Sequence, residues 1–123
     1  MSEIRANTVS NAAGTGPVTL TGQYAAKVWV NWNGTGTVAV RDSANVSSIT
    51  DNGTGTYTVN FTSALADANF SAQYSANRDA TGNYGYATAL PYNQVPTSSS
   101  IRTAISNPSV FVDSDYNFVT VHR

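Results

Sequence analysis

The sequence contains the same four-residue turn, NGTG, twice, at Asn33–Gly36 and at Asn52–Gly55. Each copy lies between two runs, within Ala26 to Phe61, in which apolar and polar residues alternate. Alternation with a period of two is typical of strands that bury one face, and Asn-Gly is a strong hairpin signal. The segment therefore predicts two consecutive β-hairpins.

The geometry of each hairpin loop follows from keeping the apolar side chains on one face. In the first copy, a two-residue loop would place Val38 and Val40 on the face opposite Val30 and Trp32. A type I turn followed by a left-handed glycine, Gly36, instead pairs Trp32 with Val38 and Val30 with Val40. We therefore expect the longer loop.

The same loop fits the second copy. It places Ile49 opposite Val59, with Tyr57 and Phe61 on the same face. It also requires a left-handed glycine at Gly55, the equivalent of Gly36. The second hairpin thus supports the register of the first.

The amino-acid sequence of this segment resembles that of a known kind of module. Ala26 to Phe61, and less strongly Ser2 to Gln23, resemble a module of tailed bacteriophages, especially phages of cyanobacteria and marine bacteria. The shared motif reads W-V-N-aromatic-N-G-T-G-T-V-A-aliphatic-R-D, which is far longer than a chance motif. The match covers about half of the chain. It implies a non-enzymatic structural part of a virion, found in tail fibres and other appendages, which are usually trimers.

The charge and composition of the chain exclude several classes of protein. Only 11% of the residues are charged and the net charge is -1, whereas binding to a phosphate backbone needs a clustered positive footprint. The six basic residues are instead scattered, at Arg5, Lys27, Arg41, Arg78, Arg102 and Arg123. The absence of cysteine excludes disulfides and thiolate metal sites. No stretch is apolar enough for membrane insertion or for a secretory signal, which predicts a soluble protein made in the host cytoplasm.

The chain divides into two parts. Residues 1–25 have no sustained period and predict an extended N-terminal arm. Residues 26–123 predict a single all-β domain, an antiparallel β-sandwich of the jelly-roll-like kind, with about nine short strands and no convincing helix. The expected strands are 27–32, 37–42, 46–50, 56–62, 69–76, 84–90, 101–105, 110–112 and 118–121.

A β domain with so few charges has weakly protected edge strands, because lysine and glutamate normally guard exposed edges. Assembly into an oligomer would cover such edges and the outward aromatic residues. Trp29 and Trp32 are the interface candidates. Alternation places Trp29 on the face opposite Trp32, so Trp29 either covers a second layer of the core or contacts another subunit. The resemblance favours the subunit contact.

No catalytic or metal-binding group stands out. His122 is the only histidine and lies next to the last residue, and Asp42 and Asp51 are better explained as strand-end residues that bond the local backbone. Asp113 to Asn117 spaces oxygen donors as a calcium loop does, but lacks the glycine and the final glutamate, so we expect a hairpin turn there. We expect no enzyme activity, no cofactor and no metal.

Binding potential is greatest in the tyrosines of the second half. Aromatic faces beside neutral amides can stack on sugars and hydrogen-bond to them, and rigid tyrosines are economical contact residues. The candidates for contact with a host receptor or glycan are Tyr84, Tyr86, Tyr92 and Asn93. Packing of these tyrosines within strands is the alternative.

These observations lead to one functional expectation with two alternatives. We expect a trimeric tail-fibre or appendage component of a phage virion that acts in host attachment and whose arm joins it to other virion proteins. The first alternative is a capsid decoration or cement protein. The second is a carbohydrate-binding module.

Overall fold

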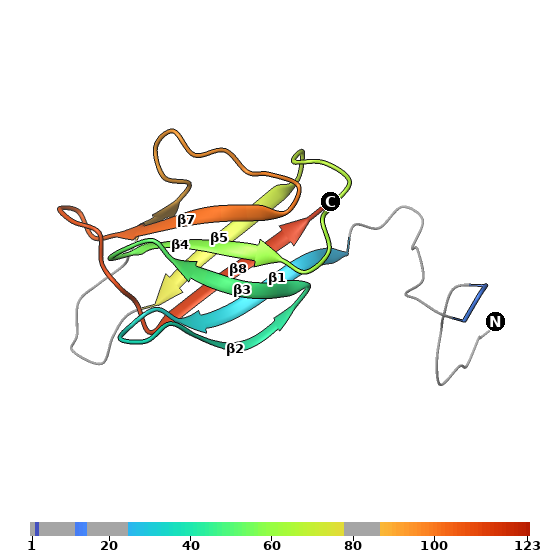
Figure 1. Cartoon of the computed structure of the whole chain (residues 1–123), viewed down its shortest axis with the longest axis horizontal. Helices are drawn as coiled ribbons and strands as arrows, with labels where there is room; N and C mark the ends of the chain where they lie inside the picture. Colours follow the sequence, from blue (N-terminus) through green and yellow to red (C-terminus); the bar gives the residue numbers. More distant parts are fainter. Residues whose placement is uncertain (1, 3–11, 15–24, 78–86) are drawn as a thin grey trace.

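The structure is a computed structural model and describes residues 2, 12–14, 25–77 and 87–123. Eight antiparallel strands form two four-stranded sheets that pack face to face (Figure 1). Sheet A has the order β2-β1-β8-β5 and sheet B the order β3-β4-β7-β6. The strands are β1 (Ala26–Asn33), β2 (Ala39–Ala44), β3 (Val46–Asp51), β4 (Thr56–Phe61), β5 (Ser71–Asn77), β6 (Ala87–Ala89), β7 (Ser100–Ser106) and β8 (Tyr116–His122). The predicted all-β antiparallel sandwich is confirmed.

The core forms because the central strands alternate between apolar and polar residues. In β1, β4 and β8 every second side chain is buried, so each strand gives one apolar row to the space between the sheets. Trp32 and Tyr57 are the largest buried side chains and meet edge to face, with ring centroids 5.8 Å apart. The other members of the buried cluster are Val28, Val30, Val59, Phe61, Ile101, Ile105, Val119 and Val121.

The predicted register is confirmed in one hairpin and wrong in the other. In the β3–β4 hairpin Ile49 pairs with Val59, and Tyr57 and Phe61 are buried beside it. In the β1–β2 hairpin Trp32 pairs with Val40 rather than Val38. A bulge then shifts the register between Asn31 and Trp32, and Val30 faces Ser43. The two NGTG copies therefore close loops of different length.

The first loop is longer because distant residues bind it. The Gly34 amide donates to the carbonyl of Ser114, at 2.9 Å. The Thr35 hydroxyl, which has one proton to donate, lies 2.8 Å from Asn33 Oδ1 and 2.9 Å from Asp115 Oδ1. These bonds hold residues 33–35 against the segment before β8, a contact that local turn preferences do not encode. After these contacts, β2 starts only at Ala39.

Two other expectations differ from the structure. Residues 110–112 are not a strand, and only an isolated bridge between Ser106 and Phe111 forms there. Residues 113–117 are not a hairpin turn, because β7 belongs to sheet B and β8 to sheet A. Residues 113–115 belong to the connection between the two sheets, and β8 begins at Tyr116. The predicted arm, residues 1–25, lies almost wholly outside the described residues, as do Tyr84 and Tyr86.

The two ends of the sandwich differ in what they carry. Ala26 at the start of β1 pairs with His122 at the end of β8, so the domain begins and ends at one place. Figure 1 shows the connections β1–β2, β3–β4 and β7–β8 together at the opposite end. We call this the distal end and define it by residues 34–38, 52–55 and 107–115.

Candidate functional site

The loops of the distal end are joined through one carboxylate. Asp113 Oδ1 accepts hydrogen bonds from the Gly55 amide, at 2.7 Å, and from the Tyr57 hydroxyl, at 2.6 Å. The same hydroxyl lies 3.0 Å from the Gly34 carbonyl, which it can also reach as a donor. Burial, together with the hydrogen bond to Asp113, raises the pKa of Tyr57 well above its ordinary range. The hydroxyl therefore remains a donor, and both NGTG turns are fixed to the β7–β8 connection.

Two glycines make this close approach possible. A Cβ atom on Gly34 would lie 2.5 Å from the Tyr57 hydroxyl oxygen. A Cβ atom on Gly55 would lie 2.5 Å from the carbonyl oxygen of Ile105 and 2.6 Å from the amide nitrogen of Val112. Gly55 also has a φ of +67°, as the sequence predicted, and its carbonyl accepts from the Ile105 amide. The three loops of the distal end are therefore packed closely against one another.

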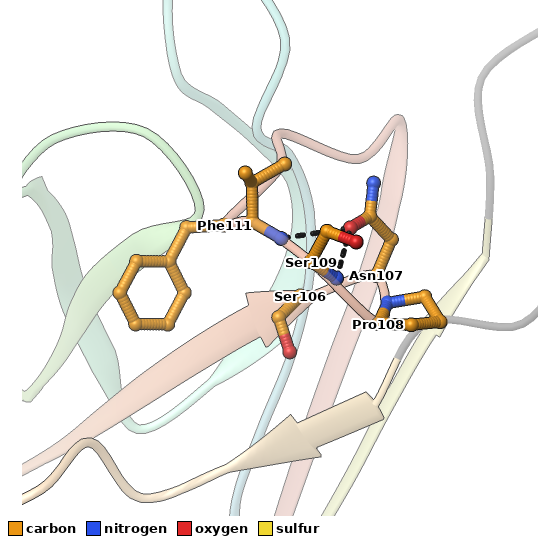
Figure 2. Close-up of a pocket in the computed structure, with 6 residues that line it drawn as sticks. Ser106, Asn107, Pro108, Ser109 and Phe111 are labelled. Carbon is orange, nitrogen blue, oxygen red and sulfur yellow. Dashed lines mark hydrogen bonds between the residues drawn. The ribbon is translucent and has the colours of Figure 1, made fainter.

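One of these loops carries a surface pocket of about 280 Å³. Figure 2 shows that a single turn after β7 forms it, with the Phe111 ring on one side. The lining residues are Ser106, Asn107, Pro108, Ser109, Val110 and Phe111. This is a candidate ligand site that the tyrosine-based sequence argument did not identify.

A second candidate surface is the outer face of sheet A. Trp29, Phe118 and Tyr116 are 37%, 37% and 44% exposed on this face. Trp29 and Phe118 are diagonal neighbours, because Asn31, two residues after Trp29, pairs with Phe118. The rings of Tyr116 and Phe118 are nearly parallel, 6.5 Å apart, and the Arg41 guanidinium lies 4.1 Å from the Tyr116 centroid. We call Trp29, Phe118 and Tyr116 the aromatic row.

The outer face of sheet B differs in character. Asn60 donates to the hydroxyls of Ser48 and Thr50, at 3.1 and 2.9 Å, and Asn52 donates to Thr58, at 2.8 Å. Short polar side chains thus bond one another across β3 and β4. On the outer face of sheet A the Arg41 guanidinium stacks on Tyr116, and all three rings of the aromatic row are more than a third exposed, so sheet A carries the more apolar outer face.

The residues singled out in the sequence lie in different places. Trp29 is outward, as predicted, but Trp32 is 1% exposed and packs in the core, so its assignment as an interface residue is wrong. Strand alternation explains the difference, since Trp32 shares the inward face of β1 with Val28 and Val30. Asn93 has a positive φ of 59° in an exposed turn, and Tyr92 is 91% exposed beside it.

Three exposed aromatic residues were not predicted from the sequence: Tyr116, Phe118 and Phe111. Tyr116 and Phe118 alternate with the buried Asn117 and Val119, so period-two analysis of β8 could have placed them outward. The exposed position of Phe111 had no comparable signal, because it depends on the path of the loop.

The candidate catalytic and metal residues have structural roles. Asp42 and Asp51 accept the nearby amides of Ser43 and Gly53, at 2.8 and 2.9 Å, which confirms the predicted backbone bonding. Asp115 accepts from Thr35, as described above. Within the described part of the chain, no cluster of three or more His, Cys, Asp or Glu side chains is placed to hold a metal ion. The described residues also contain no helix long and apolar enough to cross a membrane.

Comparisons of the chain with protein-family models, curated proteins and solved structures found no match.

Proposed function

We propose that the chain is a non-enzymatic structural component of a phage virion appendage that assembles through the outer face of sheet A and acts in host attachment. The observation that carries this proposal is the aromatic row, partly exposed on the outer face of sheet A in a chain of which only 11% of the residues are charged. Trp, Tyr and Arg are enriched among the residues that dominate binding energy at interfaces. The row contributes Trp29 and Tyr116, and Arg41 stacks beside them.

The arrangement of the two ends supports an appendage in particular. Both ends of the sandwich domain leave from one place, beside Ala26 and His122, where an N-terminal arm would join other virion proteins. The distal end then points away from that attachment and presents its loops outward. The trimeric state is what the resemblance of the sequence implies.

The mass of the assembly in solution tests the interface. We expect the full chain to form a trimer by light scattering. Trp29→Ser and Phe118→Ser should each weaken association by about tenfold or more, because each removes a ring from the contact. Tyr92→Ser is the matched control, since Tyr92 is a still more exposed aromatic residue away from the row. A wild-type monomer over a wide concentration range would contradict the proposed interface.

Localisation on particles tests the role. Gold-labelled antibodies against the chain should mark the tail or its appendages on phage that carry it. Labelling spread over the capsid shell would favour the capsid decoration alternative, and in that case capsids without the protein should leak DNA on heating. Particles without label would overturn a virion role.

A further inference from the structure

The pocket on the loop after β7 combines two kinds of surface. Pro108, Val110 and Phe111 form its apolar part, and the Val110 and Phe111 side chains are 59% and 54% exposed. Ser106, Asn107 and Ser109 form its polar part. None of the six lining residues is charged. The pocket therefore suits a neutral ligand that has one apolar face and several polar groups.

The shape of the loop is fixed by its own hydrogen bonds. Asn107 Oδ1 accepts from the amides of Ser109 and Val110, both at 2.9 Å, as Figure 2 shows. The backbone amide of Asn107 donates to the Val110 carbonyl at 3.0 Å, and Ser106 pairs with Phe111 to close the turn. Such a loop loses little conformational freedom when a ligand binds.

The polar groups in the pocket have unused hydrogen-bonding capacity. Within the described part of the chain, the Ser106 and Ser109 hydroxyls make no hydrogen bond. The side chain of Asn107 bonds only through its carbonyl oxygen, Oδ1. A purely apolar ligand would cover these hydroxyls without replacing their water, which costs free energy. An anionic ligand would find no positive side chain in the lining.

We infer that this pocket binds one neutral sugar ring. A pyranose has a face of C–H groups that can lie on the Phe111 ring, and a rim of hydroxyls that can bond Ser106 and Ser109. The volume of about 280 Å³ is just below the lower limit for pockets of drug-sized ligands, about 300 Å³, and suits a single ring. The site lies on the loop that follows β7 of sheet B, whereas the aromatic row lies on sheet A, so the inference goes beyond the proposed assembly.

Titration of the isotope-labelled full chain with methyl glycosides, followed by the chemical shifts of its amides, tests the inference. The probes are the methyl glycosides of glucose, galactose, mannose and N-acetylglucosamine, with methyl glucuronide as the anionic comparison. We expect at least one neutral glycoside to shift the amides of residues 106–111 saturably. The glucuronide should bind about tenfold more weakly.

Variants then assign the binding to the pocket. Phe111→Ala should weaken binding about tenfold, Phe111→Tyr should retain it, and Ser106→Ala should weaken it less than Phe111→Ala. Tyr92→Ala is the control for an exposed aromatic residue on another loop, and should bind as wild type does. The amide spectrum of each variant verifies its fold, and Phe111 is exposed enough for the change to be tolerated.

Four results would overturn the inference. They are the absence of a saturable shift at residues 106–111 with every neutral glycoside, equal binding of the glucuronide, wild-type affinity in Phe111→Ala, and loss of binding in Tyr92→Ala. The titration uses free protein, so its failure would leave the proposed virion role intact, and failure of the particle labelling would leave the sugar site intact.

Discussion

Gly36 and Gly55 have the same left-handed conformation but different surroundings. Their φ angles are +63° and +67°. A Cβ atom on Gly36 would meet nothing within 4 Å, whereas one on Gly55 would overlap backbone atoms of Ile105 and Val112. Gly55 is therefore constrained by both its backbone conformation and its close neighbours, whereas Gly36 is constrained by its backbone conformation only.

We predict that Gly36→Ala lowers the free energy of unfolding by about 1–2 kcal/mol, the cost of a left-handed non-glycine residue. Gly55→Ala should cost at least about twice as much, because backbone atoms must also move apart. Denaturant unfolding of both variants measures the difference. Gly36→Asn is the control and should cost less than Gly36→Ala, because asparagine tolerates this conformation. Equal losses at Gly36 and Gly55 would contradict the close packing described for the distal end.

The buried Tyr57 and the partly buried Tyr74, whose hydroxyl oxygen is buried, predict how stability responds to alkali. Burial raises the pKa of Tyr74 to about 12 from an ordinary value of 10.0, and Tyr57 shifts in the same direction. In the unfolded chain these hydroxyls release their protons near pH 10, while in the folded chain they retain them. Their contribution to stability is therefore complete below about pH 10 and is lost as the pH rises towards about 12.

Denaturant unfolding at a series of alkaline pH values checks this expectation. Tyr74→Phe should lose less stability than wild type over that range, since it removes one of the two shifted groups. Tyr92→Phe alters a side chain that is 91% exposed and should follow the wild-type curve. If Tyr74→Phe also follows the wild-type curve, the burial of the Tyr74 hydroxyl is not the cause.

Strands were more predictable than the connections between them. Period-two alternation identified the inward rows of β1 and β4, because burial of one face acts on every second residue. It also identified the turn glycines Gly36 and Gly55. The first hairpin register was not predictable, because bonds to residues more than 70 positions away set its loop. The pocket around Phe111 could not be foreseen either, because it depends on the path that residues 106–111 take after β7.

Asn45 is the shortest connection between the sheets and had no sequence signal of its own. It has a positive φ of 56° between β2 of sheet A and β3 of sheet B. Its side chain accepts from the Ser63 amide at 2.7 Å and donates to the carbonyls of Lys27 and Ser63, at 3.2 and 3.1 Å. One residue thus turns the chain and ties the first strand to the segment after β4.

Asn45→Ala and Asn93→Ala form a matched pair, because both asparagines have a positive φ. Asn93→Ala should cost about 1–2 kcal/mol from backbone conformation alone. Asn45→Ala should cost about 0.5–1.5 kcal/mol more, because the side-chain bonds to Lys27 and Ser63, which are exposed to solvent, are lost. Thermal or denaturant unfolding measures both. A loss at Asn93 as large as that at Asn45 would show that the side-chain bonds add little.

The sandwich as a whole presents two unlike outer faces and two unlike ends. Sheet B is covered by short polar side chains that bond one another, and sheet A by the aromatic row. The distal end has the loops, and the other end has both limits of the domain. Separate surfaces of the domain can therefore serve for assembly with other subunits, for anchoring to virion proteins and for the display of loops.

Deletion of residues 2–20 tests the anchoring part of that scheme. The core strands begin at Ala26, so the shortened chain should keep the unfolding temperature of the full chain within about 2 °C. It should nevertheless fail to join particles when supplied in place of the full chain, as measured by immunoblotting of purified phage. Normal incorporation of the shortened chain would refute the role of the arm, and unfolding would show that the arm belongs to the domain.

The pairing of Ala26 with His122 has a consequence for how such a domain can be combined with others. A sandwich whose first strand starts beside the end of its last strand can be inserted into a surface loop of an unrelated host protein without forcing the two sides of that loop apart. Short linkers would suffice on both sides, and the inserted unit would project with its loops outward. The sandwich is therefore suited to transfer as a unit into other proteins, both in natural gene rearrangement and in protein engineering.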